Sequence, residues 1–153
     1  MQSAEIIINS CYGGFSFSDK AIEEYKKQLQ AMGSNILFDD NKKYRCDDDL
    51  RKDPVMIDIV RRLRKESHGR HAKLTIDRYN PELTKYIKIK DYDGREWIDA
   101  DIELYRMDLI KNVLTDTTMT DSDKLAQIKE ITERKIVLYR DIDMNEDEEI
   151  DEE

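Results

Sequence analysis

Apolar residues recur along the chain in two patterns, and each pattern predicts a different kind of element. Residues 5–10 form a short β-branched run that predicts a buried strand, and the glycines at 13–14 predict a tight turn after it. Ser18 has the position of a helix N-cap, and apolar residues follow at helical spacing over residues 22–32. We therefore expect a first helix between Ser18 and Gly33, where glycine ends it.

The middle of the chain predicts a second helix and another strand. Asp53 and Pro54 combine an acidic cap with proline at the first helical position. The apolar side of this helix comprises Met56, Ile59, Val60 and Leu63. Residues 72–77 alternate between apolar and polar, as a half-buried strand does. A further short strand is expected at residues 36–38.

A β-hairpin is the clearest local prediction. Residues 86–90 alternate between apolar and polar, and residues 96–98 form a second short run. Residues 93–94 between them are Asp-Gly, a strong signal for a two-residue hairpin turn. We expect these two runs to pair as antiparallel strands.

Two helices are expected in the C-terminal part of the chain. Apolar residues return to helical spacing over residues 102–113, and residues 115–120 form a polar linker. Ser122 is the expected cap of the last helix, which is predicted to run to about Tyr139.

The order of these elements predicts an α+β fold, with a small, mostly antiparallel sheet and helices packed on one face. Residues 1–107 are expected to form the compact core and residues 108–140 a C-terminal helical extension. Residues 141–153 would follow as a disordered acidic tail. The length of 153 residues suits one hydrophobic core. Charged residues make up 40% of the chain, above the roughly 25% of an average protein, so the core should be modest.

The net charge of −9 is concentrated in the tail. Residues 141–153 hold nine acids and no base, which leaves 26 acids and 26 bases in residues 1–140. A solvated solubility tail is favoured over an interaction arm that mimics a nucleic-acid backbone or occupies a basic surface.

One basic cluster lies within the neutral part of the chain. It comprises Arg61, Arg62, Arg64, Lys65, Arg70 and Lys73. Such residues can contact phosphates, but no aromatic residue is interleaved here for base stacking. A solvated helix face is therefore favoured. Nucleic-acid binding is disfavoured but left open, as is a contact with the protein's own acidic tail.

The turn after the first strand is the candidate ligand-binding site. Its candidate residues are Cys11, Tyr12, Gly13, Gly14 and Ser18. Glycines let a ligand approach the backbone, and the N–H groups at a helix start favour an anion. The glycine spacing matches neither of the common phosphate-binding motifs, so a structural turn is favoured.

Catalytic and metal-binding patterns are weak. Cys11 would need His68 or His71 as a base to act as a nucleophile, and a buried structural thiol is favoured instead. Two histidines without a Cys-x-x-Cys pair do not predict a zinc site. No catalytic residue, metal or cofactor is assigned, and an enzyme is disfavoured without being excluded.

Two further features of the sequence bear on where in or outside the cell the protein is expected. Apolar runs such as residues 6–8 are far shorter than the roughly 20 residues of a membrane span, and no secretory signal is evident. Cys11 and Cys46 are expected to be reduced thiols in an intracellular setting.

Three segments resemble a family of short proteins of bacteriophages and large DNA viruses. They are residues 7–18 with Cys-Tyr-Gly-Gly-Phe, residues 51–57 with Arg-x-Asp-Pro, and residues 92–98 with Tyr-Asp-Gly-x-Glu. The resemblance covers about the first hundred residues and implies a viral accessory or virion protein. It implies a location in the host cytoplasm or nucleus, or in the particle, and no catalytic residue.

The leading hypothesis is a non-catalytic viral accessory or virion-associated protein that acts through protein–protein interaction. Residues 99–139 and the tail would form its partner-binding or assembly arm, with the partner a host or viral protein; a homo-oligomer is left open, and no membrane is involved. The alternative is a small-molecule or nucleotide-binding protein, hydrolases included, that uses the turn at residues 11–18.

Overall fold

The computed structural model describes residues 3–34 and 48–139, and every structural statement below concerns these residues. The expected strand at 36–38, Cys46 and the acidic tail at 141–153 lie outside them. The α+β class is confirmed. The strands form two separate two-stranded antiparallel sheets, where one small sheet was expected.

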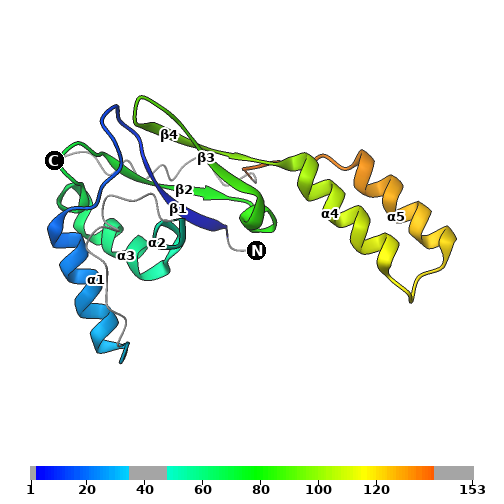
Figure 1. The fold of residues 1–153 in the computed structure, drawn as a ribbon, viewed down its shortest axis with the longest axis horizontal. Helices are drawn as coiled ribbons and strands as arrows, with labels where there is room; N and C mark the ends of the chain where they lie inside the picture. The colour runs from blue at the N-terminus through cyan, green and yellow to red at the C-terminus, as the bar shows by residue number, and fades with distance from the viewer. Residues whose placement is uncertain (1–2, 35–47, 140–153) are drawn as a thin grey trace.

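The body of the molecule is built in three layers (Figure 1). Strands β1 (Ala4–Asn9) and β2 (Leu74–Tyr79) form the middle layer, with Ile7 opposite Ile76. Successive side chains of a strand point to opposite faces. Ile7 accordingly joins the core beneath the helices, whereas Ile6 and Ile8 join the core beneath the other sheet. Burial on both faces explains why this strand has a continuous apolar run rather than an alternating one.

Helices cover one face of the β1–β2 sheet, and a hairpin covers the other. The helical layer contains α1 (Asp19–Ala31), α3 (Pro54–Leu63) and the short α2 (Asp48–Lys52), which the sequence pattern did not predict. The opposite layer is the hairpin of β3 (Ile87–Tyr92) and β4 (Arg95–Ala100). Two short 3₁₀ helices, η2 (Arg64–Ser67) and η3 (Pro81–Tyr86), connect the layers.

Two of the predicted helix caps, Ser18 and Asp53, and the predicted hairpin turn are confirmed. The Ser18 hydroxyl accepts a hydrogen bond from the Ala21 N–H at 3.1 Å. The Asp53 carboxylate accepts one from the Val55 N–H at 2.8 Å. The hairpin turn has positive φ at both central residues, Asp93 at 51° and Gly94 at 85°, which is the geometry that the Asp-Gly pair favours.

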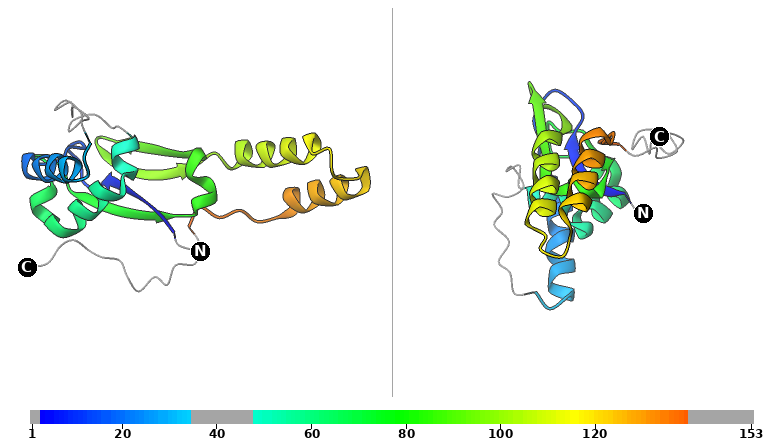
Figure 2. Two further views of the ribbon diagram at one scale, coloured as in Figure 1. Left: turned by 90° about the horizontal axis from the view of Figure 1, so that it is seen from below. Right: turned by 90° about the vertical axis from the view of Figure 1, so that its right-hand side faces the viewer.

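The C-terminal helices form an antiparallel hairpin that projects from one end of the body (Figures 1 and 2). We call this hairpin, residues 102–133, the arm. It consists of α4 (Ile102–Thr115) and α5 (Asp121–Glu133). The predicted cap at Ser122 is wrong, because Thr120 caps α5 and accepts the Asp123 N–H at 3.2 Å.

The chain returns to the body after α5. The last helix was expected to reach Tyr139 but ends at Glu133. The following segment binds η3 instead, since the Leu138 carbonyl accepts the Asn80 N–H at 2.8 Å. Ile136 and Leu138 pack on the core beneath the β3–β4 hairpin. Both ends of the arm are therefore attached to the body, and the expected boundary between residues 107 and 108 falls inside α4.

Candidate functional site

Close packing requires glycine at Gly13 of the predicted ligand-binding turn and at Gly94 of the neighbouring hairpin. A Cβ atom on Gly13 would lie 2.2 Å from the His71 carbonyl oxygen. A Cβ atom on Gly94, at the tip of the β3–β4 hairpin, would lie 2.6 Å from the Gly14 nitrogen. Three backbone segments thus meet at this turn, and the space that glycine leaves is filled by the protein itself.

Asn9 holds these segments together. Its side chain is completely buried at the end of β1. The Nδ2 group donates to the carbonyl oxygens of Cys11 at 2.9 Å and Gly94 at 2.7 Å, and Oδ1 accepts the Lys73 N–H at 2.8 Å. Sequence reasoning did not single out Asn9, although a polar residue that directly follows a buried apolar run was a signal for this role.

A buried ion pair lies behind the turn. Arg51 of α2 donates to Glu96 of β4 through Nη1 to Oε2 at 2.7 Å and Nη2 to Oε1 at 2.9 Å. Glu96 Oε2 also accepts the Asn9 N–H at 2.8 Å. The guanidinium carbon of Arg51 lies 3.6 Å from the centre of the Phe15 ring. These contacts connect the helical layer to the outer hairpin through the end of β1.

The Cys11 thiol lacks the neighbouring imidazole base that a catalytic nucleophile needs, among its hydrogen-bond partners in the described residues. Its Sγ lies 3.4 Å from Asn9 Oδ1 and 3.4 Å from the His71 backbone oxygen. Within the described ranges, the recorded hydrogen bonds of this thiol therefore go to amide oxygens and not to an imidazole. The thiol is half-buried, so the expectation of a buried one is corrected.

The predicted turn residues do not share one site. An open depression of about 520 Å³ is lined by residues 13–19 and 68–71, which include Gly13, Gly14 and Ser18 but neither Cys11 nor Tyr12. The Ser18 hydroxyl is occupied as a cap, because it accepts from Ala21 and donates to the Glu66 carbonyl. Tyr12 is instead 62% exposed, and the centre of its ring lies 5.8 Å from the guanidinium carbon of Arg95. The described residues contain no group of three acids, histidines or cysteines that could hold a metal ion.

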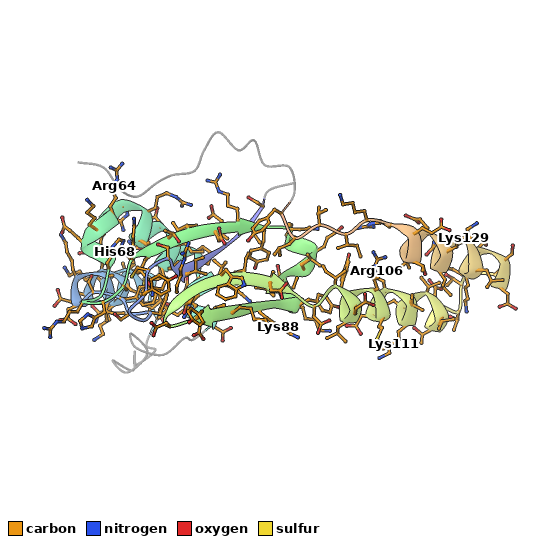
Figure 3. All side chains as sticks on the ribbon, turned by 90° about the horizontal axis from the view of Figure 1, so that it is seen from above. Arg64, His68, Lys88, Arg106, Lys111 and Lys129 are labelled. Carbon is orange, nitrogen blue, oxygen red and sulfur yellow. The ribbon has the colours of Figure 1, made fainter. Side chains whose placement is uncertain are left out.

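The basic cluster is partly neutralised by the protein itself. Arg61 pairs with Glu5 at 2.8 Å, and Arg62 pairs with Asp58 at 2.9 Å. Arg64 is exposed at the end of α3, at the opposite end of the molecule from the arm (Figure 3). Arg70 lines the open depression. Arg61 and Arg62 are thus engaged by acids of the protein itself.

The arm carries a row of exposed apolar side chains on α4. Three residues on α4 are exposed, Leu104 by 43%, Met107 by 53% and Leu114 by 56%. Within residues 104–114 these three residues are the first, fourth and eleventh, and Lys111 is the eighth. At 100° per residue these four side chains project within about a quarter turn of one another. We call this set, Leu104, Met107, Lys111 and Leu114, the α4 stripe.

The α4 stripe faces away from α5. Figure 3 shows Lys111 on the outer side of α4 and Arg106 on the side towards α5. The Arg106 guanidinium donates to the carbonyl oxygens of Ile131, Thr132 at 3.1 Å and Arg134 at 2.6 Å. These bonds satisfy carbonyl groups at the end of α5 that no helical N–H can reach.

The base of the arm is anchored by Tyr86 of η3. Its hydroxyl donates to the Asp108 carboxylate at 2.7 Å, and Lys85 lies 3.4 Å from the same carboxylate. The hydrogen bond from Tyr86 is the main cause that holds the pKa of Asp108 below its usual value, with a smaller contribution from Lys85. The same bond raises the pKa of Tyr86.

No helix in the described part of the chain combines the length and apolar character needed to cross a bilayer. Comparison with protein families, with curated proteins and with solved structures finds no match to this chain. The viral family to which three segments show a resemblance therefore stays a prediction.

Proposed function

We propose that the protein acts without catalysis, by binding another protein through the α4 stripe. The observation that carries this proposal is a row of half-exposed apolar side chains on a helix that already has a partner on its other side. Apolar residues on α4 thus exceed what the contact with α5 and the body requires. Contiguous exposed apolar surface on a projecting element is typical of a protein-binding site.

The attachment of the arm supports the same function. The Tyr86–Asp108 hydrogen bond fixes its base, and the Arg106 bonds fix α5 against α4. A helix held in one orientation can present its side chains to a partner without losing further conformational entropy on binding. This preorganisation distinguishes the arm from a flexible linker.

The ligand-binding alternative has less support from the geometry. Ser18 is engaged as a helix cap, and Gly13 and Gly94 are needed for backbone packing. Tyr12 and Cys11 lie outside the open depression. A ligand at this turn would thus find only part of the candidate residues.

The proposal keeps the viral context that the resemblance implies. A viral accessory or virion-associated protein would use the arm to bind a host or viral protein inside the infected cell, or during packaging into the particle. The acidic tail can contribute to that contact, and nothing in the proposal depends on it.

The test compares charged substitutions on two sides of α4. The full chain with Met107→Glu and Leu114→Glu places two charges in the stripe, whereas Asn112→Glu places one on a side about a third of a turn away. Each protein is recovered with chemical cross-linking from infected cells and from purified particles. We expect the stripe variant to lose its cross-linked partner and the Asn112 variant to keep it.

Fold integrity is checked by circular dichroism and thermal unfolding, because exposed sites should tolerate these changes within about 0.5 kcal/mol. An unchanged set of partners with a correctly folded stripe variant would contradict the proposal.

A further inference from the structure

We propose that the α4 stripe binds the same stripe of a second copy, so that the two α4 helices pack antiparallel against each other, with each α5 on the far side of its own α4. This inference rests on the proposed function, because it names the partner of the stripe. Three features of the molecule point to a second copy as the partner: the spacing of the stripe residues, the charges beside them, and the position of the arm.

The spacing of the stripe is the same from either end. Leu104, Met107, Lys111 and Leu114 are separated by three, four and three positions. When two copies of α4 lie antiparallel about a twofold axis near Leu109, Leu104 of one copy is level with Leu114 of the second copy. Met107 is then level with Lys111 of the second copy. A twofold interface requires this kind of self-complementary surface.

Charge selects the antiparallel arrangement over the parallel one. Two parallel helices in register would place Lys111 against Lys111, which is unfavourable. In the antiparallel arrangement, the Lys111 stem covers Met107 of the second copy and its ammonium group projects towards Glu103 there, one turn further along. Glu103 is exposed and lies on the flank of the stripe. The antiparallel arrangement thus places the single cation of the stripe near an acid of the second copy, whereas the parallel arrangement places it against a like charge.

The position of the arm leaves room for a second copy. Both helices extend beyond the body, and the body lies at one end of the arm only (Figures 1 and 2). Two antiparallel arms therefore place the two bodies at opposite ends of the paired helices.

The size of the contact between the two copies determines how tightly they are expected to associate. Stable specific interfaces bury about 1,200–2,000 Å² in total, and a contact centred on a 14-residue helix lies near the lower limit. We expect a dimer that dissociates on dilution, with a dissociation constant on the order of micromolar.

Sedimentation equilibrium of the purified full chain tests whether the dimer exists. The mass is expected to rise from one chain towards two between about 0.5 and 100 µM, the range that brackets a micromolar constant. Met107→Glu and Leu114→Glu together should weaken association at least about tenfold, and the Asn112→Glu control should leave it unchanged. A single-chain mass for the wild type at every concentration would overturn the inference.

Disulfide cross-linking tests the direction of the helices. Positions 104 and 114 lie about 15 Å apart along one helix, whereas a disulfide needs Cα atoms within roughly 7 Å. In a chain with Cys11→Ser and Cys46→Ser, Leu104→Cys alone should not cross-link, and neither should Leu114→Cys alone. A mixture of the two should form a disulfide dimer. Cross-linking of each variant with itself but not in the mixture would contradict the antiparallel pairing of the two α4 helices.

The two proposals fail in different ways. A monomeric wild type whose recovered partner is lost on stripe substitution would refute the second-copy inference and leave the proposed function standing. A monomeric wild type whose partners do not depend on the stripe would refute both.

Discussion

The Arg51 guanidinium and the Glu96 carboxylate form a buried ion pair with two hydrogen bonds, of 2.7 and 2.9 Å. The pair joins α2 to β4, 45 residues later in the chain. The same carboxylate accepts the backbone N–H of Asn9. Arg51 Nη1 also donates to the Ile7 carbonyl at 3.3 Å, whereas Nε has no partner among the described atoms. The charge of Arg51 therefore depends mainly on the Glu96 carboxylate, with further contacts to this carbonyl and to the Phe15 ring.

Removal of one charge of this pair is expected to be strongly destabilising. Glu96→Gln keeps the size of the side chain but leaves the Arg51 charge uncompensated in the interior. We expect a loss of about 3–5 kcal/mol in the free energy of unfolding. Urea denaturation measures it.

Asp58→Asn is the matched control, because it breaks the exposed pair with Arg62 and should cost less than about 1 kcal/mol. Replacement of both buried partners by methionine should recover part of the loss. Equal effects of the buried and exposed substitutions would contradict a structural role for the pair.

Because the hairpin tip packs closely against the turn, substitution by alanine is expected to destabilise the protein by different amounts at two glycines. Gly33 and Gly94 both have positive φ, 75° and 85°. Among the described residues, a Cβ on Gly33 meets nothing within 4 Å, whereas one on Gly94 meets the Gly14 nitrogen at 2.6 Å. Gly33→Ala should therefore lower the free energy of unfolding by about 1 kcal/mol, because positive φ is unfavourable for alanine. Gly94→Ala should cost about 3 kcal/mol, because the backbone must also shift.

Thermal unfolding of the two alanine variants separates these contributions. If both variants unfold at the same temperature, the hairpin tip does not pack against the turn as described.

Local elements could be predicted because their signals are local. The caps at Ser18 and Asp53 and the Asp-Gly turn depend on residues a few positions apart, and all three are confirmed. The cap of α5 was misplaced by two positions, since Thr120 and Ser122 are both good cap residues and the pattern of α5 does not distinguish them.

Long-range relationships could not be predicted. Nothing near Arg51 in the sequence indicates that its partner is Glu96, and Glu96 in an alternating strand looks like a residue for the solvent face. The same limit applies to the candidate turn. Its glycines were noticed correctly, but their role depends on His71 and Gly94, which only the fold brings close. The exposed α4 stripe was also missed, because a helix with apolar residues on two sides has no single polar face.

The hydrogen bond between Tyr86 and Asp108 predicts a pH dependence of stability. It lowers the pKa of Asp108 from its usual value of 3.8, so its contribution is complete above pH 3.8 and is lost as pH falls through the lowered pKa. It raises the pKa of Tyr86 from 10.0, so that contribution is complete below pH 10.0 and is lost as pH rises through the raised pKa. Tyr86→Phe should therefore flatten both limbs of the stability profile.

Urea denaturation between about pH 2 and pH 11 records this profile, because the range spans both usual pKa values. Tyr92→Phe, at an exposed tyrosine, is the control that should leave the profile unchanged. In an NMR titration, the pKa of Asp108 should move up towards 3.8 in the Tyr86 variant. A pKa that does not move would show that this bond does not form in solution.

Arg106 is expected to control the order of α5. Arg106→Met keeps most of the aliphatic stem but removes the donors that bind carbonyl groups at the end of α5. We expect a local loss of about 1–2 kcal/mol. Hydrogen exchange should show faster exchange over α5 and no change in β1 and β2. Uniform protection in both proteins would mean that these bonds do not hold the arm together.

Photo-cross-linking from two positions tests most directly whether the arm or the turn makes the functional contact. A benzophenone amino acid replaces either Met107 in the α4 stripe or Tyr12 at the turn, both of which are exposed in the full chain. After irradiation in the cells where the protein acts, adducts with protein, a second copy included, should form from position 107 and not from position 12. Adducts from position 12 with none from position 107 would contradict binding through the arm.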